Sequence, residues 1–370
     1  MKESDNYTFL AIADVHLGFK LFNLPELAQD LKDNFVRAID KALELKVDYL
    51  FVVGDLYDTN KPSPDLIKFV SDQVKRLGAN GCLVAGIAGD HDKPINNSAW
   101  IHLSNMMPVN SIGDKRFVGY DYSDNSAENV EKLAQLTYKD KVEWIFLHGQ
   151  VPGLFNFCAE KKMLDLKRLD LINTYSKLKG VILGDIHAPT ESTIHDPRML
   201  RNPLPYIGYC SSLGVVKTDE FGNKAGILYY NGNELTRVPF DPDRRFIKFD
   251  LGDSVEPINW VQKFERFFRD YKGKKPVFLI EYNNNSKHLL PLIAPLYEVG
   301  IVKTSISKRV SKESNEEETI NIRSELKTNN RTAMVLKELL PEKDVYDLTY
   351  QLINQEDPTV VLDAYKKTVL

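Results

Sequence analysis

The sequence has few cysteines and no long hydrophobic run. Its three cysteines, Cys82, Cys158 and Cys210, are too few and too scattered for a disulfide framework or a zinc knuckle. No run reaches the roughly 18 apolar residues that a membrane-spanning helix needs, and the residues after Met1 form no hydrophobic signal region. We therefore expect neither a disulfide-stapled secreted domain nor a membrane protein, and we expect the chain in a reducing cytoplasm, or in the nucleus of a eukaryote.

An excess of positive charge is also missing. The formal net charge of −4 over 370 residues gives no bulk electrostatic reason to bind nucleic acid. Any such binding has to come from a local patch or from bound metal ions. With 43% hydrophobic and 27% charged residues, the composition is that of a globular protein long enough for two or three domains.

Five short apolar runs, by contrast, each end at residues that can bind metal ions. Runs of roughly four to eight apolar residues bounded by Gly or by charge are typical of buried strands. The carboxyl ends of strands in an open α/β sheet form the edge where sites are built, so we expect these side chains in one crevice. The runs are 9–16, 49–55, 82–92, 144–148 and 181–187, and the residues are Asp14, His16, Asp55, Asp90, His91, His148, Asp185 and His187.

Two amphipathic helices are expected between the first three strands. Apolar residues recur at helical spacing over residues 26–46. The second helix has Ser63 as its expected N-cap, Pro64 at its first position and Gly78 at its end. Alternation of strand and helix predicts a right-handed parallel sheet.

Further strands are expected later in the chain. Residues 115–120 and 205–210 read as single strands, and 226–240 as a hairpin that turns at Asn231 and Gly232. These strands suggest a second sheet that packs on the first. The polar segment 241–245 interrupts the pattern and is the expected domain boundary.

A small α/β unit is expected beyond this boundary. Its strands are predicted at 246–251, 276–282 and 301–306, with a helix around Trp260 and another over 289–297. An acidic linker and apolar helical stretches complete the chain. The expected parts are a main domain over 1–240, a cap domain over 241–310, a linker over 311–330 and a helical partner-binding segment over 331–370.

The cluster of carboxylates and imidazoles indicates a particular chemistry. A set of this size suits two divalent ions roughly 3.5 to 4 Å apart, which polarise a phosphoryl group and generate hydroxide for in-line attack. Asp and His without thiolate favour Mn, Fe, Zn or Mg over softer ions.

The motifs that carry these residues resemble those of the calcineurin-like metallophosphoesterases. That family's pattern is DxH, GD, GNHD, H and GHxH, and the corresponding segments here are 14–16, 54–55, 89–92, 148–149 and 184–187. Within the family the likeness is closer to SbcD-type nucleases of DNA double-strand-break repair, the partners of SbcC-type coiled-coil ATPases. Segments 13–18, 53–58 and 206–212 and the cap carry this closer resemblance. It implies an α/β fold, a two-sheet metallophosphoesterase sandwich flanked by helices, then a small α/β cap and C-terminal helices.

The resemblance also implies roles for individual residues. His91 would protonate the leaving 3′ oxygen or position the scissile phosphate, and Asp92 would orient its ring. Lys20, Lys61 and Lys93 follow the ligand strands and are candidate phosphate contacts. One ion would be held by Asp14, His16, Asp55 and His187, and the other by Asp55, Asp90, His148 and Asp185.

Two positions depart from the family pattern. Asp90 stands in place of the Asn, and Asp185 stands in place of the first His of GHxH. Each departure adds a negative charge, so four aspartates would bring the first shell close to neutral. A more neutral site lowers the pKa of bound water less. These two substitutions leave two outcomes open: a changed metal preference, towards Mg or Mn, and a loss of activity.

The leading hypothesis is a two-metal-dependent DNA nuclease that hydrolyses phosphodiester bonds at DNA ends. Its expected cofactors are two divalent ions, Mn²⁺ or alternatively Mg²⁺, and its expected partners are DNA, an SbcC-type ATPase and a second copy of the chain. The alternatives are a phosphodiesterase of small substrates and a non-catalytic scaffold subunit. The segment 331–370 would dock on the ATPase or fold back on the cap.

Overall fold

The computed structural model describes most of the residues that precede position 251 and three strands of the expected cap. The expected helix around Trp260, the linker over 311–330 and the helices over 331–370 lie outside the described residues. None of the described helices is long and apolar enough to cross a bilayer. The described residues are 6–93, 104–152, 154, 160–166, 171–193, 205–221, 225–250, 273–282, 296–297 and 300–306.

Contacts along the chain separate two compact units. The first contains residues 1–248, 267–279 and 299–303, and the second contains 249–266, 280–298 and 304–370. All the metal-capable residues of the five motifs lie in the first unit. The division that the sequence predicts at residue 240 stays a prediction.

The first sheet has six strands in the order β11-β10-β1-β2-β3-β4. Its four strands β1 to β4 are parallel to one another, and the hairpin β10–β11 joins antiparallel to β1. The strands are β1 Phe9–Ile12, β2 Tyr49–Val53, β3 Leu83–Ile87, β4 Met107–Pro108, β10 Gly226–Tyr230 and β11 Leu235–Pro239.

The second sheet has five strands in the order β5-β6-β7-β9-β8, of which β8 alone is antiparallel to its neighbour. β12 Arg244–Asp250, β13 Lys274–Tyr282 and β14 Ile301–Ile306 form a separate three-stranded sheet. The strands of the second sheet are β5 Phe117–Tyr120, β6 Trp144–His148, β7 Gly180–Gly184, β8 Glu191–Thr193 and β9 Tyr206–Tyr209.

This pairing corrects two predictions. The five ligand-bearing runs do not share one sheet, because β6 and β7 belong to the second sheet. The hairpin 226–240, predicted in the second sheet, lies in the first, where Tyr230 pairs with Phe9. The strands β6, β7 and β10 are apolar on both faces, so their pattern does not reveal which backbone they pair with.

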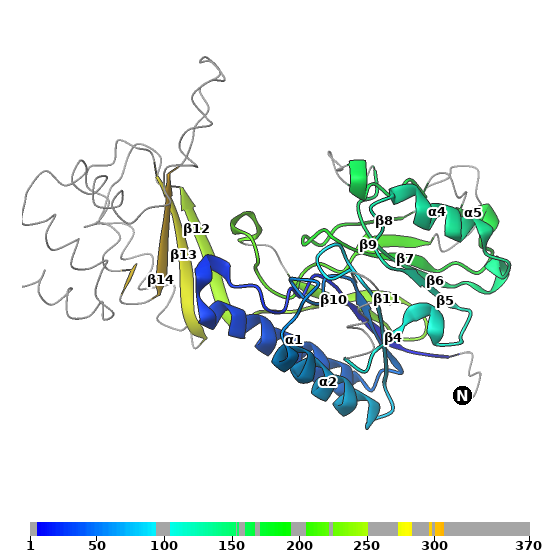
Figure 1. The fold of residues 1–370 in the computed structure, drawn as a ribbon, viewed down its shortest axis with the longest axis horizontal. Coiled ribbons are helices and arrows are strands. Elements are labelled where there is room, and N and C mark those ends of the chain that lie inside the picture. Colours follow the sequence, from blue (N-terminus) through cyan, green and yellow to red (C-terminus); the bar gives the residue numbers. More distant parts are fainter. Residues whose placement is uncertain are drawn as a thin grey trace, which may run out of the picture. The chain divides into compact units, whose positions relative to one another are not determined.

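The helices α1 Pro25–Leu45 and α2 Pro64–Gly78 confirm the two predicted crossovers. The side chain of Ser63 caps α2, since its hydroxyl oxygen accepts from the backbone N–H of Leu66 at 3.3 Å. Two shorter helices, α4 Ser126–Gln135 and α5 Leu171–Thr174, accompany the second sheet. Figure 1 shows α1 and α2 by the first sheet and α4 and α5 by the second.

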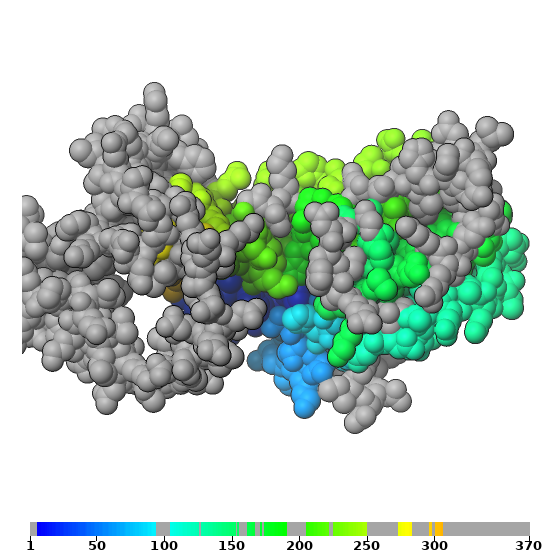
Figure 2. Space-filling view, turned by 90° about the horizontal axis from the view of Figure 1, so that it is seen from above, coloured from blue at the N-terminus to red at the C-terminus, as the bar shows by residue number. Residues whose placement is uncertain are grey.

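The two sheets share an aromatic core. Along β1, Leu10 packs in the core with α1 and α2, while Phe9 packs in the core between the sheets, as the alternation of a strand requires. Phe51 of β2 stacks on Phe146 of β6 with ring centroids 4.3 Å apart. In the space-filling view, residues near the start of the chain (blue) accordingly lie against residues from its middle (green) (Figure 2). This packing fixes the strand ends of both sheets against each other.

Candidate metal centre

The ligand-bearing residues lie just beyond the strand ends, where the backbone is strained. Asp14, His16, Asp55 and Asp185 have positive φ values of 52°, 50°, 50° and 94°. Such backbone costs about 1–3 kcal/mol per residue and clusters at functional sites. The strain marks this edge of the sandwich as a site rather than a set of ordinary turns.

Two motif glycines let the ligands approach closely. A Cβ atom on Gly54 would lie 2.1 Å from Nδ1 of His148, and one on Gly89 would lie 2.1 Å from Oδ1 of Asp55. Because both distances are far below van der Waals contact, neither position accepts a side chain. The glycines of the GD and GDHD motifs are therefore required by the ligands that pack on them.

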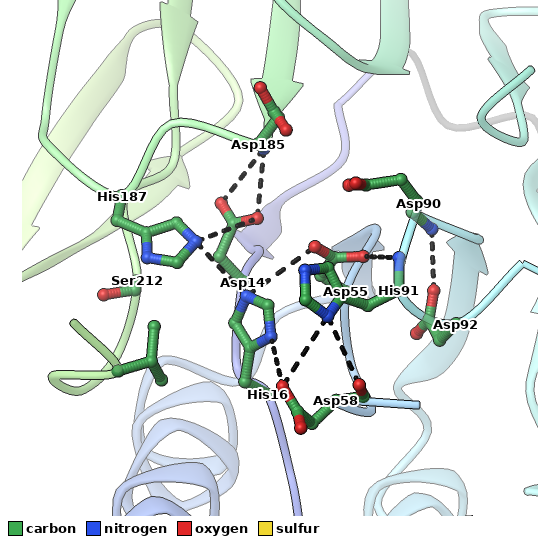
Figure 3. Close-up of polar contacts among 12 residues, drawn as sticks. Asp14, His16, Asp55, Asp58, Asp90, His91, Asp92, Asp185, His187 and Ser212 are labelled. Carbon is green, nitrogen blue, oxygen red and sulfur yellow. Dashed lines mark hydrogen bonds and ion pairs between the residues drawn. The ribbon is translucent and has the colours of Figure 1, made fainter. Parts of the chain in front are cut away.

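The structure brings together the side chains of Asp14, His16, Asp55 and His187, the predicted ligands of one ion, which we call the first subsite (Figure 3). Nε2 of His16 lies 3.2 Å from Nε2 of His187 and 3.6 Å from Oδ2 of Asp55. Nε2 of His187 lies 4.0 Å from Oδ1 of Asp14. The complete burial of Asp14 raises the pKa of its carboxyl, even though neighbouring histidines lower it. Oδ1 of this buried carboxyl accepts from the backbone N–H of Asp185 at 3.0 Å.

Hydrogen bonds fix the imidazoles of the first subsite. Nδ1 of His187 lies 2.5 Å from Oε1 of Glu220, and Nδ1 of His16 lies 3.3 Å from Oδ1 of Asp58. Since a carboxylate accepts, each Nδ1 atom carries a proton, and the two Nε2 atoms face each other at a hydrogen-bonding distance of 3.2 Å. Burial lowers the pKa of His187, but the hydrogen bond to Glu220 and the charge of Asp14 raise it further. Two Nε2 atoms at this spacing can both bind one metal ion. The residues therefore fit a divalent metal ion.

The structure also brings together Asp55, Asp90, His148 and Asp185, the predicted ligands of the other ion, which we call the second subsite. Nδ1 of His148 donates to the carbonyl oxygen of Val53 at 3.0 Å, which leaves Nε2 for the site. That Nε2 lies 3.3 Å from Oδ1 of Asp90 and 3.5 Å from Oδ2 of Asp55. The donor set again suits a hard or borderline divalent cation.

Asp55 belongs to both subsites. Its Oδ2 faces Nε2 of His16 and Nε2 of His148, while its Oδ1 accepts from the backbone N–H of His91 at 3.0 Å. Burial raises the pKa of Asp55, but the charge and hydrogen bond of His148 outweigh it and lower the pKa to about 2. The shared carboxylate is thus an anion, as a bridge between two cations has to be.

Lys162 lies among the carboxylates of the second subsite. Its Nζ is 2.7 Å from Oδ2 of Asp90 and 2.5 Å from Oδ1 of Asp185. Nε2 of Gln150 donates to the other oxygen of Asp185 at 2.7 Å. Burial lowers the pKa of Lys162, yet the charge of Asp185 and the hydrogen bonds to both aspartates raise it further, so the side chain is an ammonium ion.

Comparison with known proteins places the chain in a family. The family model for calcineurin-like phosphoesterases matches residues 7–189. A DNA double-strand break repair protein Mre11 from Methanocaldococcus jannaschii is 35% identical over 73% of this chain and 75% of its own length. The Mre11 protein of Sulfolobus acidocaldarius is 36% identical over 97% of both chains. The chain belongs to the Mre11 family of calcineurin-like phosphoesterases.

Among solved structures, a dimetal phosphatase from Danio rerio is similar in part. It aligns with a TM-score of 0.40 and 12% identity over 64% of this chain and 99% of that one. The family membership rests on the sequence matches alone. It makes the chain a metal-dependent phosphodiesterase of the α/β class, as predicted.

The His91 ring contacts Asp58, whereas the sequence predicts that Asp92 orients it. The two carboxylate oxygens of Asp92 accept backbone N–H groups, from Tyr57 at 3.1 Å and from Gly89 at 2.7 Å. Nδ1 of His91 instead lies 3.2 Å from the carbonyl oxygen of Asp58 and 3.6 Å from its carboxylate. Asp58 therefore orients the His91 ring, while Asp92 holds the turn that carries Asp90 and His91.

The three lysines predicted near phosphate differ in their surroundings. Lys20 and Lys61 are exposed on the loops after β1 and β2. Lys93 pairs with Asp124 and lies over the ring of Tyr122. Their contact with a substrate stays a prediction.

The sequence did not reveal four residues that complete the centre, namely Asp58, Gln150, Lys162 and Glu220. Asp58 had a usable signal, because it stands three residues after Asp55 in one motif. Lys162 and Glu220 lie in short 3₁₀ segments with no strand or helix pattern. Only the folded chain brings them to the ligands.

Proposed function

We propose that the chain is a two-metal-dependent DNA nuclease that hydrolyses phosphodiester bonds at DNA ends. The observation that carries this proposal is the position of Asp55, whose carboxylate faces His16 on one side and His148 on the other. In the proposal Asp55 would be a ligand of both divalent ions, for which Mn²⁺ is the first choice and Mg²⁺ the second. The remaining ligands are those of the two subsites.

Bound ions supply Lewis acidity and a hydroxide nucleophile at neutral pH. The chain contributes His91, whose side chain is 42% exposed and whose ring lies edge-on to that of His16, 4.7 Å away. A carbonyl oxygen only accepts, so the contact with Asp58 keeps a proton on Nδ1 of His91 and leaves Nε2 for the substrate. We propose that a protonated Nε2 donates its proton to the leaving 3′ oxygen.

DNA as the substrate is supported by the curated relatives, which are named DNA double-strand break repair proteins. We propose that the chain acts as a homodimer with an SbcC-type coiled-coil ATPase in the processing of double-strand breaks. The negative net charge means that phosphate contacts have to be local. Lys20 and Lys61, both exposed after ligand strands, are our candidates.

Cleavage assays on two substrates test the activity. With Mn²⁺, we expect degradation of linear double-stranded DNA from its ends and slower hydrolysis of bis(p-nitrophenyl) phosphate, and neither after chelation. Hydrolysis of the small ester without any DNA cleavage indicates a phosphodiesterase of small substrates. Failure with both substrates, while Mn²⁺ still binds, supports the scaffold alternative suggested by Asp90 and Asp185.

The ATPase partner calls for a separate experiment. We propose that residues 331–370 dock on the ATPase, so deletion of 320–370 removes co-purification with it. Mn²⁺ binding by the shortened chain is the control, because every proposed ligand lies before residue 188. Retained co-purification contradicts the docking role of this segment.

A further inference from the structure

The second subsite already contains a positive charge from the chain itself. Nζ of Lys162 contacts one oxygen of Asp90 and one of Asp185, and Gln150 donates to the second oxygen of Asp185. Of the four oxygens of these two carboxylates, the fourth, Oδ1 of Asp90, faces Nε2 of His148. The two carboxylates that depart from the family pattern are thus the two that share the ammonium group of Lys162.

The backbone holds Lys162 in this position. The N–H of Gln150 donates to the carbonyl oxygen of Lys162 at 2.7 Å, and the N–H of Leu164 donates back to Gln150 at 2.7 Å. These bonds tie the segment of Lys162 to the residues that follow β6 and its ligand His148. The side chain of Lys162 is 27% exposed, whereas the adjacent Lys161 lies on the surface.

No described lysine is bound to the carboxylates of the first subsite in the way that Lys162 is bound in the second. Within the described part of the chain, no lysine or arginine forms an ion pair with Asp14, His16 or His187. An ion entering the first subsite displaces no side chain, whereas one that uses Asp185 in the second has to displace Lys162 or Gln150. Opposite charges this close attract strongly when partly buried, so displacement opposes binding.

We propose that Lys162 is a built-in cation of the second subsite that competes with the second divalent ion. The two ions therefore bind with unequal affinity: the first subsite fills at low metal concentration, and the second fills only when the ion displaces the ammonium group. This inference rests on the two-metal site of the proposed function but not on DNA as the substrate.

Calorimetric titration of metal-stripped, full-length protein with Mn²⁺ tests the inference. The wild type is expected to bind one ion tightly and a second at least about tenfold more weakly, the scale on which groups next to a metal ligand alter its affinity. In Lys162→Met the second ion is expected to gain about tenfold or more in affinity while the first is unchanged. Lys161→Met, which removes an exposed lysine one residue away, is the matched control and should behave as wild type.

The outcomes separate this inference from the proposed function. Two equally tight ions in the wild type, or a second ion that binds no better in Lys162→Met, overturn the role of Lys162 and leave the two-metal site intact. No bound Mn²⁺ in the wild type overturns both. If Lys162→Met does not fold, by circular dichroism, Lys162→Gln removes the charge with a polar side chain and carries the same expectation.

Discussion

Among the described residues, no lysine or arginine forms an ion pair with Asp14 in the first subsite, whereas in the second subsite Asp90 and Asp185 are bound to Lys162. The first subsite thus leaves its ligand atoms open to a metal ion, and in the second one ammonium group already offsets part of the carboxylate charge. The difference shows that two subsites of similar ligand count need not have similar affinity. Affinity depends on what an ion must displace as well as on its ligands.

The shared carboxylate joins the two halves, so its removal has the largest expected effect. Asp55→Asn replaces a bridging anion by a neutral amide, and we expect both tight Mn²⁺ binding and phosphodiester hydrolysis to be lost. Calorimetry and hydrolysis of bis(p-nitrophenyl) phosphate measure the two losses. Asp65→Asn, an exposed position in the first turn of α2, is the matched control. Turnover retained in Asp55→Asn contradicts the bridged site.

His91 is expected to affect the chemistry without affecting either ion. His91→Gln should lower the rate of hydrolysis by about 10²- to 10⁴-fold, the usual contribution of a positioned acid or base. Mn²⁺ binding should remain as in the wild type. His91 also lies close enough to His16 and Asp55 to be a ligand. Loss of a bound ion in this variant would assign it to the first subsite.

Glu220 is expected to affect only the first subsite. Glu220→Gln removes the carboxylate that holds Nδ1 of His187 and should weaken the first ion by about 10- to 100-fold. The affinity of the second ion should be unchanged, as calorimetry can measure. Glu234→Gln in the exposed turn of the β10–β11 hairpin is the control. An equal loss at both subsites would mean that Glu220 supports the fold rather than one ligand.

The smallest expected effect is that of Gln150, which donates to Asp185 in the second subsite. Gln150→Met removes the hydrogen bond that the uncharged amide donates to the carboxylate of Asp185 and should strengthen the second ion by about tenfold, the lower end of the value of a hydrogen bond to a charged group. Gln29→Met removes an exposed glutamine that likewise donates to an aspartate, Asp33, and should change neither ion. Weaker binding of the second ion in Gln150→Met would show that Gln150 positions Asp185 for the metal instead of competing with it.

The sequence by itself determined the local elements and the ligand set. The helix that begins after Ser63 and ends at Gly78 follows from a cap, a proline and an apolar stripe, which act within one turn. The seven predicted ligands each stand at or just after a strand end in a short motif, so within each sheet the direction of the parallel strands brings its ligands to one edge. Such signals lie in residues that are close together in the sequence, so they do not depend on how the rest of the chain packs.

Only the tertiary structure decided which strands share a sheet and which side chains hold the ligands. β6 and β7 look like strands of the first sheet because a buried strand is apolar on both faces and carries no mark of its partner. His91 turned out to be oriented by Asp58, and Asp185 by Lys162 and Gln150, through contacts between loops. Contacts of this kind depend on where separate segments meet in space, and no periodicity in the sequence encodes that meeting.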